Sequence, residues 1–151
     1  MSGFLVNLSK LYREQMERHR NRPFLRATMA GCALVSMANG AVTLRDRVRV
    51  DQVLETLDTL QVYDPHEGVA LFNEFVEALE QSAEEGRRRA LEAIDAEVAQ
   101  EPEKAGLLIR ICLAVSEVEN WVPAQEQEQI AELCDHLGVE QNICPAHGSD
   151  A

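Results

Sequence analysis

The chain has 151 residues, of which 46% are hydrophobic and 26% are charged, a composition typical of one soluble globular domain. Its formal net charge of −12 argues against a nucleic-acid-binding protein, because phosphate contacts need a positive face. No apolar run approaches the ~18–20 residues of a membrane span, which argues against a transmembrane protein.

The first segment of the chain is basic and amphipathic. Phe4, Leu8 and Tyr12 are among the apolar residues that recur at helical spacing, so a helix is predicted over residues 3–20. Residues 1–26 carry six basic and two acidic side chains, a net charge of +4, and the remainder then carries −16. Two readings stay open: the basic arm packs on the acidic body, or it contacts anionic lipid or an acidic partner. No signal-peptide pattern is present, so we expect a cytoplasmic protein whose four cysteines are thiols.

Six further helices follow the break at Asn21-Arg22-Pro23, and no segment has a convincing strand pattern. Apolar periodicity, capping residues and prolines place them at Pro23–Ala38, Thr43 to about Leu60, Pro65 to Leu79, Ala83–Gln100, Pro102 to the turn at Glu117–Val122, and Pro123–Leu137. We therefore predict an all-α, single-domain bundle of about seven helices over residues 1–139. Residues 140–151 are predicted to be a polar tail.

The centre of the chain is duplicated. Residues 27–57 align without a gap on residues 107–137, at an offset of 80. Identical pairs include Cys32/Cys112, Val35/Val115, Ser36/Ser116, Val42/Val122 and Leu57/Leu137. Each copy reads as an apolar helix, a polar turn and an amphipathic helix. Two copies indicate an internal duplication with a pseudo-twofold pair of helix-turn-helix units, since a solenoid needs at least three repeats.

Oxygen-bearing side chains hold matching positions in the two turns. They are Asn39 and Asp46 in the first copy and Glu119 and Glu126 in the second, seven residues apart in each. If the halves pack symmetrically, all four face one region, where carboxylates can hold Ca²⁺ or another divalent cation. The alternative is structural, because an acid in a first helical turn is favoured by the helix dipole without any ligand.

The segments ALVSMANGAVTLRDR, LQVYDPHEGVALFNEFVEAL and LAVSEVENWVPAQEQEQIAELCDHLGVE resemble the tellurite-resistance protein TerB family over about residues 8–139. The resemblance implies an all-helical fold and a divalent-cation site built from acidic residues of both halves. It also implies a non-enzymatic role in tellurite and other chemical stress, in complexes with other proteins at the inner membrane face.

The chain departs from the family pattern at the site itself. The first Asp of the family motif is Asn39 and the later Glu is Asp46; in the second motif the Asp is Glu119, the Gly is Asn120, and Glu126 is retained. Three carboxylates and one amide replace four carboxylates, which predicts weakened cation binding. A protein–protein interaction module that has lost the metal is the alternative function.

Other candidate sites are less specific. Cys134, His136, Cys144 and His147 are ligand types that Zn²⁺ accepts, but their spacing is unlike common zinc modules. Cys144 is the one candidate for a reactive thiol. His66 lies beside acidic residues, which could suggest acid/base catalysis, but no nucleophile accompanies it. No constellation of base, nucleophile and oxyanion donor is found, so we expect no catalytic activity.

Overall fold

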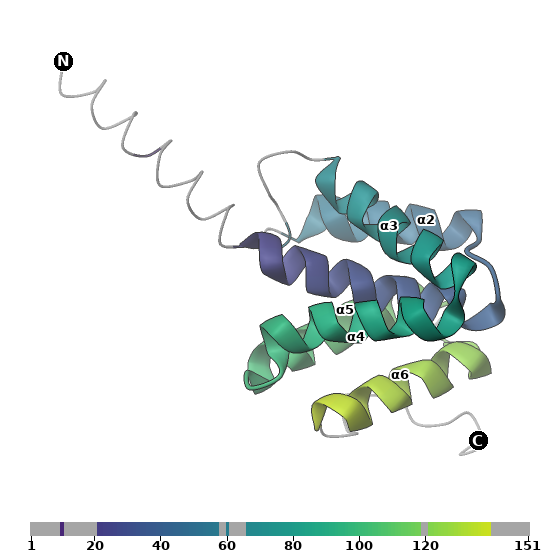
Figure 1. Ribbon diagram of the computed structural model, residues 1–151. Coiled ribbons are helices and arrows are strands. Elements are labelled where there is room, and N and C mark those ends of the chain that lie inside the picture. Colours follow the sequence, from purple (N-terminus) through teal and green to yellow (C-terminus); the bar gives the residue numbers. More distant parts are fainter. Residues whose placement is uncertain (1–9, 11–20, 58–59, 61–65, 119–120, 140–151) are drawn as a thin grey trace.

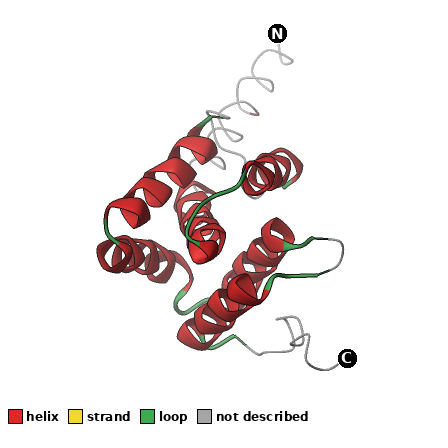
Figure 2. Cartoon of the chain, turned by 90° about the vertical axis from the view of Figure 1, so that its right-hand side faces the viewer, coloured by secondary structure: helices red, strands yellow, loops and turns green. Residues whose placement is uncertain are grey.

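The computed structural model is an all-helical bundle with one helix at its centre (Figures 1 and 2). It describes residues 10, 21–57, 60, 66–118 and 121–139. The elements are a helix over residues 21–36, here called the central helix, then η1 (Met37–Asn39), α2 (Leu44–Thr56), α3 (Glu67–Gln81), α4 (Ala83–Val98), α5 (Pro102–Ser116) and α6 (Ala124–Leu137). These described ranges contain no strand, and their one β-bridge is an isolated pair, Val118 with Trp121. The predicted all-α fold is therefore confirmed.

The central helix forms the core because it is apolar nearly all round. Leu25, Met29 and Val35 are among its fully buried side chains, and Figure 1 shows it passing between α2 and α3 on one side and α4 and α6 on the other. The corresponding helix of the second repeat, α5, buries Leu108 and Ile109. Each fully buried aliphatic side chain contributes about 1.5–3 kcal/mol of transfer free energy, so these two helices account for a large part of the core.

Local sequence signals set the ends of the helices. Thr43 caps α2 in a capping box, and the Ser82 hydroxyl accepts a hydrogen bond from the backbone N–H of Glu85 at 3.2 Å at the start of α4. Gly40 (φ 95°) closes η1 and Gly138 (φ 68°) ends α6, both in the left-handed conformation that glycine adopts without strain. These residues fix where the chain turns toward the candidate site.

Several predicted boundaries differ from the observed ones. The central helix ends at residue 36 instead of 38, because the next residues tighten into η1, where the Gly40 N–H donates to the Met37 carbonyl at 2.9 Å. The helix from Thr43 ends at Thr56, before the predicted Leu60. Six α-helices lie in the described ranges; the predicted helix at 3–20, the cap at Asp64-Pro65 and the tail at 140–151 fall outside them, apart from Lys10.

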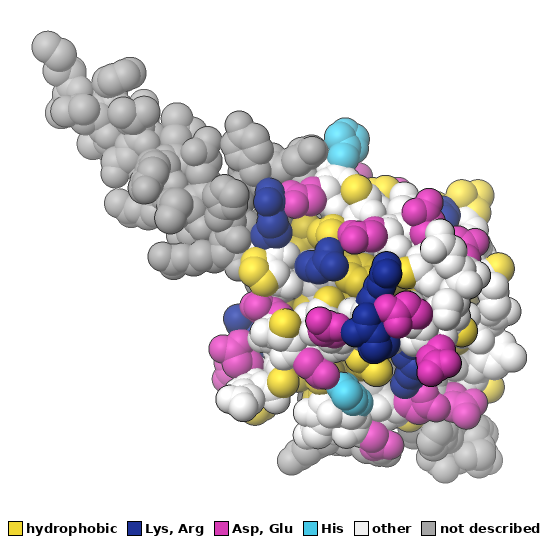
Figure 3. Space-filling view, viewed as in Figure 1, with side chains coloured by type: hydrophobic (Ala, Val, Ile, Leu, Met, Phe, Trp, Pro, Cys, Tyr) yellow, Lys and Arg dark blue, Asp and Glu magenta, His cyan; other side chains and the backbone are white. Residues whose placement is uncertain are grey.

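On the face that Figure 3 shows, basic side chains (dark blue) lie beside acidic ones (magenta). Arg88 contacts Glu85 at 2.6 Å and Glu92 at 2.8 Å, both on its own helix, α4. Arg22 contacts Glu67 at 2.8 Å, and Arg26 contacts Glu74 at 3.3 Å while its guanidinium lies 4.9 Å from the centroid of the Phe75 ring. At these two positions the basic segment packs on the acidic body. No helix of the described chain has both the length and the apolarity that crossing a membrane requires.

Candidate metal centre

The two repeat halves pack crosswise. The second helix of the first half, α2, packs on α5 of the second half, and α6 of the second half packs on η1 of the first. Each amphipathic helix therefore packs on an element of the other half. The charge of Asp46 in α2 acts on Glu126 in α6, so the starts of these two helices lie near each other.

Asp46 and Glu126 are brought together by this packing. Each is the third residue of its helix, and each is buried, with 7% and 4% of its surface exposed. Burial, together with the nearby negative charge of Asp46, raises the pKa of Glu126 from 4.5 to about 7. Two carboxylates thus share a poorly solvated site, where a proton or a cation offsets their repulsion.

The two acids differ in their local partners. Asp46 Oδ2 accepts a hydrogen bond from the Thr43 N–H at 2.9 Å, and the Thr43 hydroxyl accepts one from the Asp46 N–H at 3.2 Å. Pro123 occupies the position equivalent to Thr43 and has neither an N–H nor a side-chain oxygen, so Glu126 cannot form the same box. Within the described residues, the Glu126 carboxylate has no hydrogen-bond or ion-pair partner.

Of the other two predicted ligands, only Asn39 is among the described residues. Asn39 is exposed at the end of η1, the element that packs on α6. Glu119 lies outside the described residues, but residues on either side of it make hydrogen bonds. Val118 and Trp121 exchange backbone hydrogen bonds of 2.6 and 2.9 Å, and Arg49 of α2 donates to the Glu117 carbonyl at 3.3 Å.

Two buried serines, to which the sequence analysis assigned no role, precede the turns. The hydroxyls of Ser36 and Ser116 lie at repeat-equivalent positions at the ends of the two buried helices, and neither has a hydrogen-bond partner in the described structure. Buried polar atoms normally find partners. In the sequence, the two serines could have been recognised because they are identical residues 80 positions apart. Each lies at the end of a buried helix, just before a repeat turn.

The zinc hypothesis is not supported at Cys134. This residue is fully buried and disulfide-bonded, so the expectation that all four cysteines are thiols is wrong there, whereas Cys32 and Cys112 are free. His136 Nε2 lies 2.8 and 2.9 Å from the two Asp95 carboxylate oxygens, and Cys144 and His147 fall outside the described residues. Among the described side chains, no three His, Cys, Asp or Glu residues are grouped to hold a metal.

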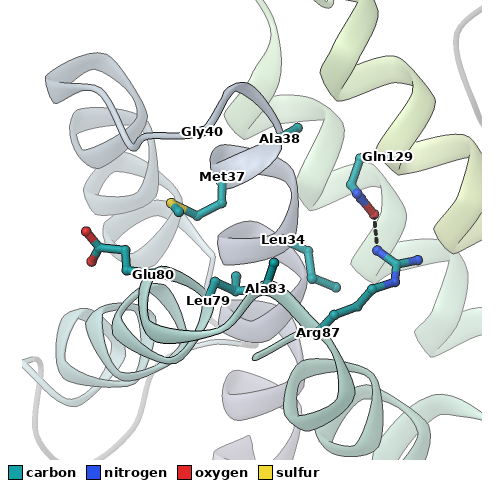
Figure 4. Close-up of a pocket in the computed structure, with 9 residues that line it drawn as sticks. All are labelled: Leu34, Met37, Ala38, Gly40, Leu79, Glu80, Ala83, Arg87 and Gln129. Atoms are coloured by element: carbon teal, nitrogen blue, oxygen red, sulfur yellow. Dashed lines mark hydrogen bonds between the residues drawn. The ribbon is translucent and has the colours of Figure 1, made fainter. Parts of the chain in front are cut away.

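A hollow of about 620 Å³ lies beside η1 (Figure 4). Leu34, Met37 and Leu79 line it with apolar surface, and Arg87 and Gln129 face it from α4 and α6, joined by a hydrogen bond. Its volume is in the range of small-molecule and peptide-side-chain sites. The hollow adjoins the first repeat turn, because Met37, Ala38 and Gly40 line it.

Comparisons with known proteins agree on one family. A family model described as "Tellurite resistance protein TerB" matches residues 25–145. The chain is 26% identical to tellurium resistance protein TerB of Alcaligenes sp over 111 residues, which cover 74% of this chain and 90% of that protein. No solved structure gives a significant match.

Proposed function

Because the chain belongs to the TerB family of tellurite resistance proteins, we propose that it binds a divalent cation between its two repeat turns and acts without catalysis in a stress response. In this proposal it is a cytoplasmic protein that assembles with other proteins of the response, at the inner face of the membrane. Ca²⁺ is the first cation to test, since it accepts many oxygen ligands in flexible geometry.

The observation that carries the proposal is the buried pair of Asp46 and Glu126. Two carboxylates of like charge in a poorly solvated place destabilise the folded state unless a proton or a cation accompanies them. The raised pKa of Glu126 means that the protein alone resolves this conflict by protonation. A divalent cation resolves it at higher pH, with both carboxylates ionised.

The remaining ligands are the predicted Asn39 and Glu119, with water completing the shell. Asp46 already commits Oδ2 to the Thr43 N–H, so its other oxygen and the two Glu126 oxygens are the free carboxylate donors of the described pair. An amide in place of one acid lowers the charge of the site. We therefore expect weaker binding than a site of four carboxylates provides.

Melting experiments in chelator, Ca²⁺ and Mg²⁺ test the proposal. A cation that binds the folded state raises the melting temperature progressively as its concentration exceeds the dissociation constant, and Glu126→Gln should abolish the rise. The matched control is Glu128→Gln, which makes the same charge change at an exposed position of α6. Trp121, the single tryptophan and half exposed beside the second turn, supplies an independent fluorescence signal. No response to millimolar cation in either measurement excludes the site.

The hollow beside η1 favours a second candidate, a protein-interaction module without metal. Ala83 is an exposed residue at its edge, so Ala83→Arg should fill it and reduce recovery of partners in a pull-down. Ala96→Arg, at an exposed position further along α4, is the matched control. Recovery that depends on Ala83 but not on a chelator supports this candidate over the cation-binding one.

A further inference from the structure

The two halves of the chain meet through a pair of cysteine side chains. Cys32 of the central helix and Cys112 of α5 occupy the same position in the two repeats, and both are fully buried free thiols. Interaction with Cys32 raises the pKa of the Cys112 thiol, so the two side chains are neighbours. Neither belongs to the carboxylate site, so their proximity calls for a separate explanation.

The backbones approach closely at this point because Gly31 precedes Cys32. A Cβ atom placed on Gly31 would lie 3.0 Å from Cys112 Sγ and 3.1 Å from Leu108 Cδ2. The Cys112 sulfur therefore packs directly against the central helix beside Cys32. A side chain at residue 31 would require these neighbouring atoms to shift by a few tenths of an ångström, so the two helices cross closely here.

We propose that Cys32 and Cys112 form an oxidisable dithiol, which a small peroxide-class oxidant converts into a disulfide linking the two repeat halves. One thiol is first oxidised by hydrogen peroxide to a sulfenic acid, with release of water. The second sulfur then attacks the sulfenic sulfur, forming the S–S bond and releasing a second water. In total, two thiols and one peroxide give one disulfide and two waters, and a dithiol reductant reverses the change.

Packing favours a disulfide over a metal held by the two sulfurs. Closing an S–S bond of the usual ~2.0 Å requires the two sulfurs to approach each other, and the Cys112 sulfur already packs against the central helix beside Cys32. An inserted ion would have to push apart two helices that meet at Gly31. Bond closure is therefore the chemistry that this crossing accommodates.

The surroundings also explain why the pair rests in the reduced state. The hydrogen bond with Cys32, burial, and the charge that Cys32 carries when ionised all raise the pKa of the Cys112 thiol well above its usual value. Thiolate is the reactive form, so reaction is slow and requires a small neutral oxidant or a brief opening of the core. Oxidation would then fix the central helix to α5, the two helices that lead into the oxygen-rich turns.

The test uses the full chain, treated with hydrogen peroxide in the presence of chelator. Intact mass should fall by two hydrogen atoms relative to the untreated protein, and digestion under non-reducing conditions should yield one peptide pair joining Cys32 to Cys112. The melting temperature of the oxidised monomer should rise, because the bond closes a loop of about 80 residues and constrains the unfolded chain. Reductant should break the Cys32–Cys112 bond, so that the joined peptide pair disappears and the melting temperature falls again.

Three variants assign the bond. Cys32→Ser and Cys112→Ser should each abolish the loss of two hydrogens, whereas Cys134→Ser should keep it. Peptide mapping of the wild-type protein gives the same answer if a variant fails to fold. Free thiols after prolonged peroxide, sulfinic acid at either position, a bond to a different cysteine, or a lower melting temperature on oxidation would each overturn the proposal. The outcome is independent of cation binding, since chelator is present throughout.

Discussion

Replacing Glu126 with glutamine should stabilise the cation-free protein above neutral pH. The folded state keeps a proton on Glu126 up to about pH 7, whereas the unfolded chain releases it near the ordinary value of 4.5. Between these two pH values the folded state binds more protons, so the free energy of unfolding falls as pH rises. The difference of 2.5 pKa units, at 1.36 kcal/mol each, means that the folded state is destabilised by roughly 3 kcal/mol above pH 7. Glutamine has nearly the shape of the protonated acid and avoids this loss.

The assay is chemical denaturation in chelator, near pH 5 and near pH 8. The free energy of unfolding of the wild-type protein should be up to roughly 3 kcal/mol lower near pH 8 than near pH 5. For Glu126→Gln the difference should be much smaller. Glu128→Gln, exposed on the same helix, should behave as wild type does. An equal loss in wild type and Glu126→Gln, or a Glu126→Gln protein less stable than wild type near pH 8, would refute the reasoning that burial and Asp46 oppose ionisation of Glu126.

Four further outcomes are expected. Asp46→Asn should lower the pKa of Glu126 in a carboxyl NMR titration without restoring its ordinary value, because burial is the larger cause; an unchanged pKa would mean that the two acids do not interact. Calcium affinity, measured by calorimetry, should fall about fivefold from pH 7 to pH 6, since a proton competes for Glu126 with a pKa of about 7, and a pH-independent affinity would place the ion elsewhere. Asn39→Asp should tighten calcium binding roughly tenfold by adding a fourth carboxylate, and no gain would remove Asn39 from the ligand set. Gly86→Ala should cost about 1–3 kcal/mol in a denaturant melt, because a Cβ there would lie 2.6 Å from the backbone of Leu79; a neutral change would contradict the close approach of α3 and α4.

Much of the fold could be predicted because its signals are local. Thr43 and Ser82 start their helices as capping residues, and the apolar stretches around Cys32 and Cys112 identify the two buried helices. The ends of helices were predicted less well. The switch from α-helix to η1 after Ser36 depends on how Gly40 closes the turn, which hydrophobic periodicity does not encode.

The sequence could predict that one pair of acids lies close together, but not how their surroundings change their ionisation. An offset of 80 pairs Asp46 with Glu126, and the structure brings these two together. The near-complete burial of Glu126 depends on α6 packing against η1 of the other half, a long-range contact without a sequence signal. The disulfide at Cys134 was likewise missed, because cysteine pairing depends on tertiary proximity.

The duplication separates two explanations for an acid in the first turn of a helix. A helix dipole favours the ionised carboxylate, and so does a capping box, which accounts for Asp46 through its hydrogen bonds with Thr43. At Glu126, Pro123 removes the box, and the pKa is raised where a dominant dipole would lower it. Neither local explanation therefore accounts for Glu126. What remains is a buried carboxylate facing a second one, an arrangement that is unfavourable for an isolated helix end and favourable once a cation lies between them.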